Sequence, residues 1–337
     1  MGEIGSEFSY VEISESTGIK FPLMNDSRLV FSGRTAIETA IKNENIKKVL
    51  MPSYCCDSMI EPFRKSGIDV QFYQVNYDDE LIINIEIPSD IDCVLWCNYF
   101  GFINSMPIFE DFIKKGGIVI EDITHSMFSK YVYHEQSDYL VASVRKWLPV
   151  LSGGFVAAKK KLQYKPDNKP SKEYIRNKRK AMLEKKVFLD GDASICKSHF
   201  LDGYAWANKW LANNYSGLTI DDFSFKIIHS VDSECIRKRR INNAKHLYKE
   251  LEKCSDIRFL FPVDKMDCPL FVPVVILNGK RDIIREKLTE HDIYCPVHWP
   301  RPEMNCKSNL YDLELSLVCD QRYDKNDMQR IADILCM

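Results

Sequence analysis

Short apolar runs that alternate with amphipathic stretches dominate the first half of the chain. Five runs are rich in Val, Ile, Leu and aromatic residues and predict strands: 48–52, 70–75, 92–97, 118–120 and 139–142. Between them, apolar side chains at helical spacing predict helices over 36–42, over the stretch that ends at Phe63, and over 106–115. Strands that alternate with helices at this spacing form a mostly parallel sheet with helices on both faces. The pattern therefore predicts an α/β fold.

The second half begins with a strongly basic stretch, residues 159–186. We expect it to form an exposed loop and helix, because a run of charges is usually a solvated face. The remaining pattern predicts helices over 201–211, 230–254, 280–291 and 328–337, and a strand over 270–276. We place a domain boundary just before the long helix. The predicted parts are an N-terminal arm (1–27), a large α/β domain (28–230) and a small C-terminal α+β domain (231–337).

Composition and charge narrow the class of protein. The chain has 337 residues, 45% of them hydrophobic and 28% charged, which is ordinary for a soluble globular protein. Its net charge of -2 argues against nucleic acid as the main ligand. No apolar run approaches the roughly 18 residues of a membrane span, and the N-terminus lacks the features of a secretory signal. The Met-Gly start with Ser6 matches the positions of a myristoylation motif, but the acids Glu3 and Glu7 argue against this modification. We expect a cytoplasmic protein without a membrane partner.

The cysteines predict neither a disulfide framework nor a metal site. There are 12, most of them scattered in apolar runs, and without a signal peptide we expect reduced, buried thiols. Cys55-Cys56, Cys93 with Cys97, and Cys295 with His298 are the nearest candidates for zinc. None has the paired spacing of a structural zinc site, so we expect no metal.

Charged side chains follow two of the predicted strands. The run 118–120 ends in Glu121-Asp122, and the run 139–142 ends in Ser143-Val144-Arg145-Lys146. In an open α/β sheet, ligands bind outside the carboxyl ends of the strands. Pyridoxal phosphate (PLP) requires a lysine amine for its aldehyde and an acid beside its ring nitrogen. We therefore assign Lys146 to the aldehyde and Asp122 to the ring nitrogen.

Other residues could complete such a site. His125 could reach the phenolic oxygen of the cofactor, and Ser143 its phosphate. The turn Phe31-Ser32-Gly33-Arg34-Thr35 enters a helix, whose free N–H groups can seat a phosphate. The small pair Gly153-Gly154 would let the backbone turn tightly. Each feature also has an ordinary interpretation: an Asp at a strand end often caps a helix, and Tyr54 or Tyr99 could stack on the cofactor or simply fill the core.

Several motifs in order resemble one enzyme family. They are Gly33-Arg34-Thr35-Ala36, Met51-Pro52-Ser53-Tyr54, the segment VIEDITHS (119–126), Ser143 to Lys146 with Gly153-Gly154, IYCPVHWP (293–300) and DQRY (320–323). From about Phe31 to its C-terminus, the chain resembles the DegT/DnrJ/EryC1/StrS family of PLP-dependent sugar aminotransferases. The resemblance implies the aspartate aminotransferase fold (fold type I), with a large, mostly parallel sheet domain and a small α+β domain.

The resemblance also implies roles for single residues. Lys146 would carry the cofactor as an internal aldimine, Asp122 would pair with the pyridine nitrogen, and His125 would approach the phenolic oxygen. Ser143 and the turn of Gly33, Arg34 and Thr35 would hold the phosphate. The family further implies a homodimer with shared active sites, and a keto-sugar nucleotide or related small keto compound as substrate beside an amino donor. The sequence names neither the acceptor nor the donor.

The chain departs from the family pattern in three places, and alternatives stay open. Ser143 and Lys146 are three residues apart rather than five. Cys56 stands where the family places a stacking ring, for which Tyr54 could substitute. Asn213-Asn214-Tyr215 is a poor match to the N-x-R segment that reaches across the dimer. A PLP-dependent lyase or decarboxylase acting on a non-sugar amine is one alternative. A serine hydrolase is another, since Ser143 to Lys146 reads S-x-x-K, although neither S-D-N nor K-T-G occurs. A PLP-fold protein without turnover is a third.

Overall fold

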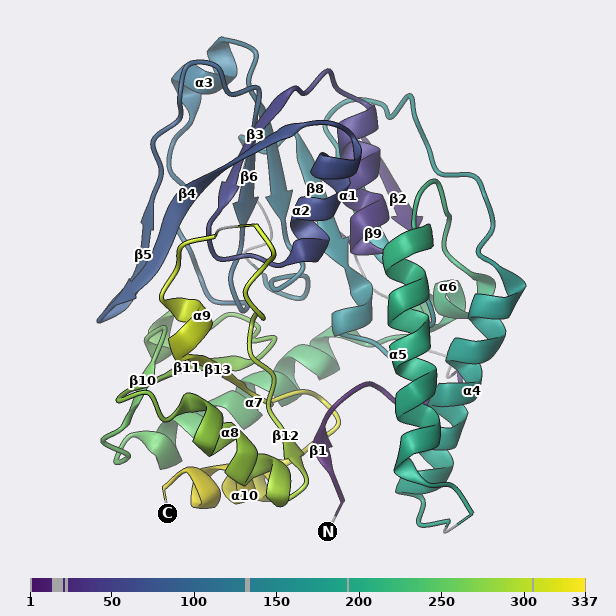
Figure 1. Ribbon diagram of the computed structural model, residues 1–337, viewed down its shortest axis with the longest axis vertical. Helices are drawn as coiled ribbons and strands as arrows, with labels where there is room; N and C mark the ends of the chain where they lie inside the picture. Colours follow the sequence, from purple (N-terminus) through teal and green to yellow (C-terminus); the bar gives the residue numbers. More distant parts are fainter. Residues whose placement is uncertain are drawn as a thin grey trace.

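The computed structural model describes residues 2–13, 21, 24–130, 134–192, 194–304 and 306–336. Its centre is an eight-stranded sheet in the order β2-β9-β8-β7-β6-β3-β4-β5 (Figure 1). The strands are β2 (Asp26–Val30), β3 (Lys48–Pro52), β4 (Asp69–Asp78), β5 (Glu80–Asn84), β6 (Cys93–Cys97), β7 (Ile118–Asp122), β8 (Tyr139–Ser143) and β9 (Gly154–Ala158). The five strands from β8 to β4 are parallel, whereas β9, β2 and β5 join by antiparallel pairing. The predicted mostly parallel sheet is confirmed in this central part.

The central strands are buried because their residues are apolar on both faces. Every residue of β6 and β9 is buried, as expected for strands covered by helices on both sides. Helices α1 (Gly33–Lys42) and α2 (Asp57–Lys65) follow β2 and β3 and lie beside each other in Figure 1. Helix α3 is shorter than predicted, with bounds Glu110–Lys114 instead of 106–115.

A second, smaller sheet lies in the C-terminal part of the chain (Figure 1). It contains β10 (Ile257–Phe259), β11 (Val272–Ile276) and β13 (Glu314–Leu317), all antiparallel. The helices of this part are α7 (Ser233–Leu251), α8 (Arg281–Glu290), α9 (Leu310–Leu313) and α10 (Lys325–Leu335). A separate core cluster packs Leu247, Val274 and Ile331 together, and Ile4 from the N-terminal arm joins it. Strand β1 (Ile4–Gly5) pairs in parallel with β12 (Ile293–Tyr294). The predicted domain limits stay a prediction.

The basic stretch contributes a helix that is less exposed than predicted. Helices α4 (Lys172–Leu189) and α5 (Lys197–Asn214) lie side by side, and α6 (Asp222–His229) follows them (Figure 1). Lys178 and Lys185 of α4 are buried, and their amines lie 3.5 Å from Glu7 Oε2 and 2.7 Å from Glu3 Oε1. The prediction of a purely solvated face is therefore wrong for these two lysines: ion pairs with the N-terminal arm compensate their burial.

The cysteines differ from the prediction in one disulfide and in two exposed thiols, those of Cys196 and Cys235. The sulfur atoms of Cys254 and Cys336 are bonded to each other, whereas the other ten cysteines are free. Within the described ranges, no group of three or more His, Cys, Asp or Glu side chains is arranged to hold a metal ion. No helix in the described part of the chain has the length and apolar character needed to cross a membrane.

Candidate active site

The ends of β7 and β8 bring the two predicted key residues to one cavity. Asp122 is the last residue of β7, and Lys146 lies in the single 3₁₀ turn η1 (Val144–Lys146) directly after β8. Because these strands are parallel neighbours, their carboxyl ends meet at the same edge of the sheet. Asp122 and Lys146 both line a cavity of ≈ 110 Å³, together with Ser32, Gly33, Arg34, Cys56, Thr124, His125, Ser143 and Trp299.

Side chains along β7 alternate between the two faces of the sheet, so the two acids at its end, Glu121 and Asp122, lie on opposite faces. Asp122 faces the cavity, whereas Glu121 points to the other face of the sheet. There the Glu121 carboxylate accepts hydrogen bonds from Asn98 Nδ2 at 2.6 Å, the His134 backbone N–H at 2.9 Å and Ser137 Oγ at 2.5 Å. Of the two acids, only Asp122 is therefore available to a ligand in the cavity.

Asp122 is a buried carboxyl with one backbone contact. The Thr124 N–H donates to its Oδ1 at 2.8 Å. Burial raises the pKa of Asp122 above its ordinary 3.8, although the hydrogen bonds of Thr124 and the charge of Lys146 oppose the rise. A cationic partner in the cavity would favour the ionised form of this carboxyl. The site thus suits a ligand that brings a protonated ring nitrogen to Asp122.

His125 contacts the amine of Lys146. The Phe100 N–H donates to His125 Nδ1 at 3.2 Å, so in the neutral ring the proton is on Nε2. That Nε2 lies 3.3 Å from Lys146 Nζ. Burial lowers the pKa of His125 well below 6.5, with contributions from Lys146 and His298, so the ring is neutral. An ammonium group cannot accept a hydrogen bond, so with this tautomer His125 Nε2–H donates to Lys146 only when the lysine is a free amine. Burial also lowers the pKa of Lys146. The free amine is the form that attacks an aldehyde.

The first turn of α1 forms the other end of the cavity. Ser32 caps the helix, and the N–H groups of Gly33 and Arg34 have no partner within it. A side chain at Gly33 would place its Cβ 3.1 Å from Ser143 Cβ, so glycine permits the close approach of the two segments. At Gly154 the reason for glycine differs from the prediction. Its φ is not positive, but a Cβ there would lie 2.1 Å from Ser32 O.

The structure does not bring every predicted residue to the cavity. Thr35 lies behind the α1 turn, where its N–H donates to Ser32 Oγ at 3.2 Å and its hydroxyl donates to Tyr215 O at 2.9 Å. Arg34 lines the cavity, and its Nε pairs with Glu61 Oε2 at 2.7 Å, so part of its guanidinium is already engaged. Tyr54 is fully buried and packs behind Trp299, with ring centroids 5.2 Å apart.

Sequence reasoning missed Trp299 as a member of the site. Its ring stacks on His125 with centroids 5.3 Å apart at 29°, and Lys146 Nζ lies 5.5 Å from its centroid. Its indole Nε1 is buried without a hydrogen-bond partner among the described residues. The signal was present in the IYCPVHWP segment, but nothing in the sequence placed that segment beside β7. Trp299 thus places an aromatic ring at the cavity.

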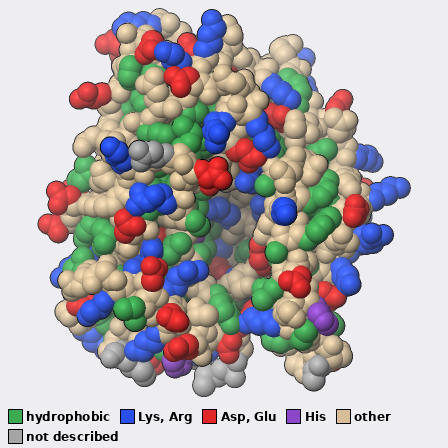
Figure 2. Space-filling model, in the orientation of Figure 1, with side chains coloured by type: hydrophobic (Ala, Val, Ile, Leu, Met, Phe, Trp, Pro, Cys, Tyr) green, Lys and Arg blue, Asp and Glu red, His purple; other side chains and the backbone are tan. Residues whose placement is uncertain are grey.

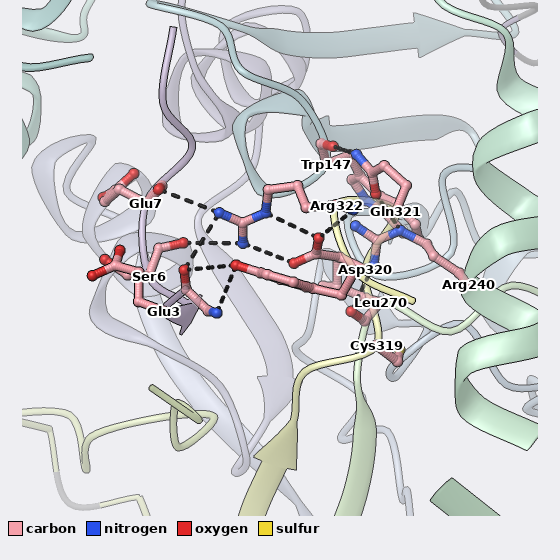
Figure 3. A network of polar contacts seen from close by, with 12 residues as sticks. Glu3, Ser6, Glu7, Trp147, Arg240, Leu270, Cys319, Asp320, Gln321 and Arg322 are labelled. Atoms are coloured by element: carbon pink, nitrogen blue, oxygen red, sulfur yellow. Dashed lines mark hydrogen bonds and ion pairs between the residues drawn. The ribbon is translucent and has the colours of Figure 1, made fainter. Parts of the chain in front are cut away.

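A second, larger cavity of ≈ 450 Å³ adjoins the first and shares Arg145 and Lys146 with it. Figure 2 shows a hollow near the middle of the face, between the two halves of the molecule. One wall of this cavity is the N-terminal arm, from Gly5 to Phe8. Arg322 holds the arm by donating to the carbonyl oxygens of Gly5, Ser6 and Glu7, and it also pairs with Asp320 at 2.8 Å (Figure 3).

The residues of the smaller cavity fit PLP. A carboxylate for the ring nitrogen, a free amine for the aldehyde and a helix N-terminus with Ser143 for the phosphate all border the same space. His125 and Trp299 offer ring faces beside it.

Comparison with known proteins supports the fold. No family model matches the chain, and no curated protein matches it in sequence. Solved structures do match. A DegT DnrJ EryC1 StrS aminotransferase from Brucella abortus has a TM-score of 0.58 at 13% identity, with 93% of this chain and 85% of that chain covered. NtdA from Bacillus subtilis with bound cofactor PMP has a TM-score of 0.61 at 14% identity, with 93% of this chain and 74% of that chain covered. DesI in the presence of its TDP-sugar product has a TM-score of 0.60 at 13% identity, with 93% of this chain and 80% of that chain covered. The chain therefore has the fold of the PLP-dependent aminotransferases, as the resemblance in the sequence predicted.

Proposed function

We propose that this chain is a PLP-dependent aminotransferase that acts on a keto-sugar nucleotide or a related small keto compound. One observation supports it most directly. A single cavity contains the Asp122 carboxyl, the Lys146 amine 3.3 Å from His125 Nε2, and the first turn of α1. When bound, PLP supplies the electron sink that transamination needs.

Each side chain has a distinct task in this proposal. The Asp122 carboxylate would hold the proton on the pyridine nitrogen of the cofactor. The Lys146 amine would hold the aldehyde, and as a free amine it would accept and return a proton of the substrate. His125 lies 3.3 Å from Lys146 and would be available to the phenolic oxygen. Ser143 and the N–H groups of Gly33 and Arg34 would hold the phosphate.

The charge of the larger cavity supports an anionic substrate. Its lining includes the cations Arg145, Arg240, Arg285 and Arg322, against the acids Glu7 and Asp320. Such an excess of cations attracts a diphosphate or carboxylate. The TDP-sugar product of DesI is a ligand of this chemical class. The amino donor, commonly an amino acid, also carries a carboxylate and would use the same cations.

A homodimer with shared active sites is part of the proposal. Leu183, Leu201 and Phe225 are exposed on α4, α5 and α6, where they supply apolar surface for a second copy. Light scattering on the purified protein tests the dimer: a monomeric mass at micromolar concentration would contradict it.

The function is tested by half-reactions read as spectra. Incubation of the PLP-loaded protein with glutamate should convert the cofactor to its pyridoxamine form. Keto-sugar nucleotides should then return it to the original spectrum. A Lys146→Ala variant is the matched control, because it keeps the fold but lacks the amine. Failure with every common amino donor would favour a PLP-dependent lyase or decarboxylase instead.

A further inference from the structure

Arg145 lies at the junction of the two cavities. It lines the smaller cavity together with Ser143, two residues before it, and it also lines the larger cavity. Val144, which stands between these two residues, is fully buried in the apolar core with Trp147 and Leu148 instead. Arg145 therefore borders the smaller cavity next to the serine that the proposed function assigns to the phosphate.

The positive charge of Arg145 is not neutralised by an ion pair with any residue that the structure describes. Its Nε is buried and has no hydrogen-bond partner there. Burial raises the pKa of Glu7, but the charges of Lys178 and Arg145 lower it to about 2. The Glu7 carboxylate forms its ion pair with Lys178, at 3.5 Å, and not with Arg145. Tyr174, on which the charge of Arg145 also acts, is a phenol whose pKa burial raises to about 12, so it is neutral.

The same charge reaches the amine of Lys146. Burial lowers the pKa of Lys146, Cys56 and Asp122 oppose the change, and Arg145 adds to it. Interactions between charges weaken with distance and with screening by solvent. The guanidinium of Arg145 is therefore close enough to the smaller cavity to act on a group inside it.

A phosphate in the smaller cavity needs a cation that the other side chains do not supply. The cationic side chains among its lining residues are Arg34, Arg145 and Lys146. Arg34 already pairs with Glu61 through its Nε, and the amine of Lys146 is assigned to the aldehyde. The first turn of α1 offers only the equivalent of roughly half a charge, whereas a phosphate monoester carries about −1.5 to −2 at pH 7. Because an uncompensated buried charge is costly, Arg145 is the side chain that can balance the phosphate.

We propose that the guanidinium of Arg145 binds the phosphate of the cofactor, beside Ser143 and the first turn of α1. This rests on the proposed function, because it takes PLP as the ligand of the smaller cavity, and it adds the cation of that site. A planar guanidinium donates two parallel hydrogen bonds to phosphate oxygens, which an ammonium group cannot do. Arg285 lines the larger cavity but not the smaller one, so it remains available to the anionic group of the substrate.

Pyridoxal isolates this contact, because it has the ring and the aldehyde of PLP but no phosphate. Both ligands are titrated into the apoprotein, and binding is followed by tryptophan fluorescence. In Arg145→Gln, the affinity for PLP should fall about 10- to 100-fold, the effect of a lost charge-assisted hydrogen bond, whereas the affinity for pyridoxal should be nearly unchanged. Unchanged affinity for PLP, or an equal loss for both ligands, would overturn the contact.

Two matched variants separate the contact from the general field of the cavities. Arg145→Lys keeps the charge without the planar fork, so its affinity for PLP should lie between those of the unmodified protein and Arg145→Gln. Arg285→Gln removes one positive charge from the larger cavity and should leave the affinity for PLP unchanged. A loss in Arg285→Gln as large as that in Arg145→Gln would mean a long-range effect of charge, and the proposed contact would be wrong. Near-UV circular dichroism verifies the fold of each variant.

Inorganic phosphate is a second probe, and its binding involves no aldehyde. It should compete with PLP for the unmodified apoprotein, and its inhibition constant should be higher for Arg145→Gln; equal inhibition constants would overturn the proposal. Failure of the proposed function looks different. Glutamate would then leave the spectrum of the bound cofactor unchanged, while the affinity for PLP still depended on Arg145.

Discussion

Replacement of Glu314 by Gln should change how stability depends on pH. The Glu314 carboxyl is fully buried, and burial raises its pKa from 4.5 to about 8. In the unfolded chain the carboxyl loses its proton near its ordinary pKa, whereas in the folded protein it keeps the proton to about pH 8. Between these values the folded state binds more protons, so the free energy of unfolding falls as the pH rises.

The size of the effect follows from the pKa rise. Each pH unit corresponds to about 1.36 kcal/mol, so a rise of roughly 3.5 units corresponds to about 5 kcal/mol. The contribution of Glu314 is fully present below about pH 4.5 and lost by about pH 8. Gln has nearly the shape of the protonated carboxyl and does not titrate. The two proteins should therefore be similarly stable at about pH 5, and Glu314→Gln should be the more stable one at about pH 9.

Urea unfolding followed by circular dichroism at several pH values measures this difference. All other groups titrate alike in both proteins, so the difference between them isolates Glu314. Glu286→Gln, an exposed acid on α8, is the matched control and should follow the unmodified protein. Parallel pH profiles of the unmodified protein and Glu314→Gln would refute the reasoning, because they would mean that the carboxyl is already ionised in the folded state.

Three further changes test the site. Lys146→Ala should abolish the visible absorbance of lysine-bound cofactor, and borohydride should fix no cofactor to the variant; an unchanged spectrum would exclude Lys146. Asp122→Asn loses a charge-assisted hydrogen bond, so fluorescence titration should show cofactor affinity lowered roughly 10- to 100-fold, with turnover reduced further; near-normal rates would argue against the assignment. Gly154→Ala places a Cβ 2.1 Å from Ser32 O and should lower the free energy of unfolding by about 1–3 kcal/mol in urea, unlike Gly2→Ala, whose Cβ meets open space.

Hydrophobic periodicity predicted the strands and helices whose own sequence has a clear period. The five predicted strands of the first half and helices α1 and α2 are present, because their apolar residues repeat with a clear period. Strands β2, β5 and β9 were missed. Strands β2 and β9 pair with each other although they lie more than 100 residues apart, and β5 is an edge strand that follows β4 through a tight turn. The C-terminal helix begins at Lys325 rather than at residue 328, because Asp324 and Asp327 form a capping box that periodicity does not register.

The residues of the site also fall into two groups: those that the sequence placed at the cavity and those that it did not. Asp122 and Lys146 follow apolar runs directly, so the order of elements placed them at one edge of the sheet. Trp299 and His298 come from a segment more than 150 residues away, and no local pattern brings it to β7. Thr35 and Tyr54 fit the motifs by position, but their side chains are directed by neighbours: Tyr215 binds the Thr35 hydroxyl, and Tyr54 packs against Trp299.

Because Arg322 binds the N-terminal arm, the arm forms part of the wall of the larger cavity. Its guanidinium donates to three consecutive carbonyl oxygens, from Gly5 to Glu7, and Lys185 donates to the last of them at 2.7 Å. Trimming these few residues would remove a wall of this cavity, expose the buried Lys185 and leave Arg322 with Asp320 as its remaining partner. An affinity tag on this protein therefore belongs at the other end, and preparations that differ in their first residues are not interchangeable in ligand-binding assays.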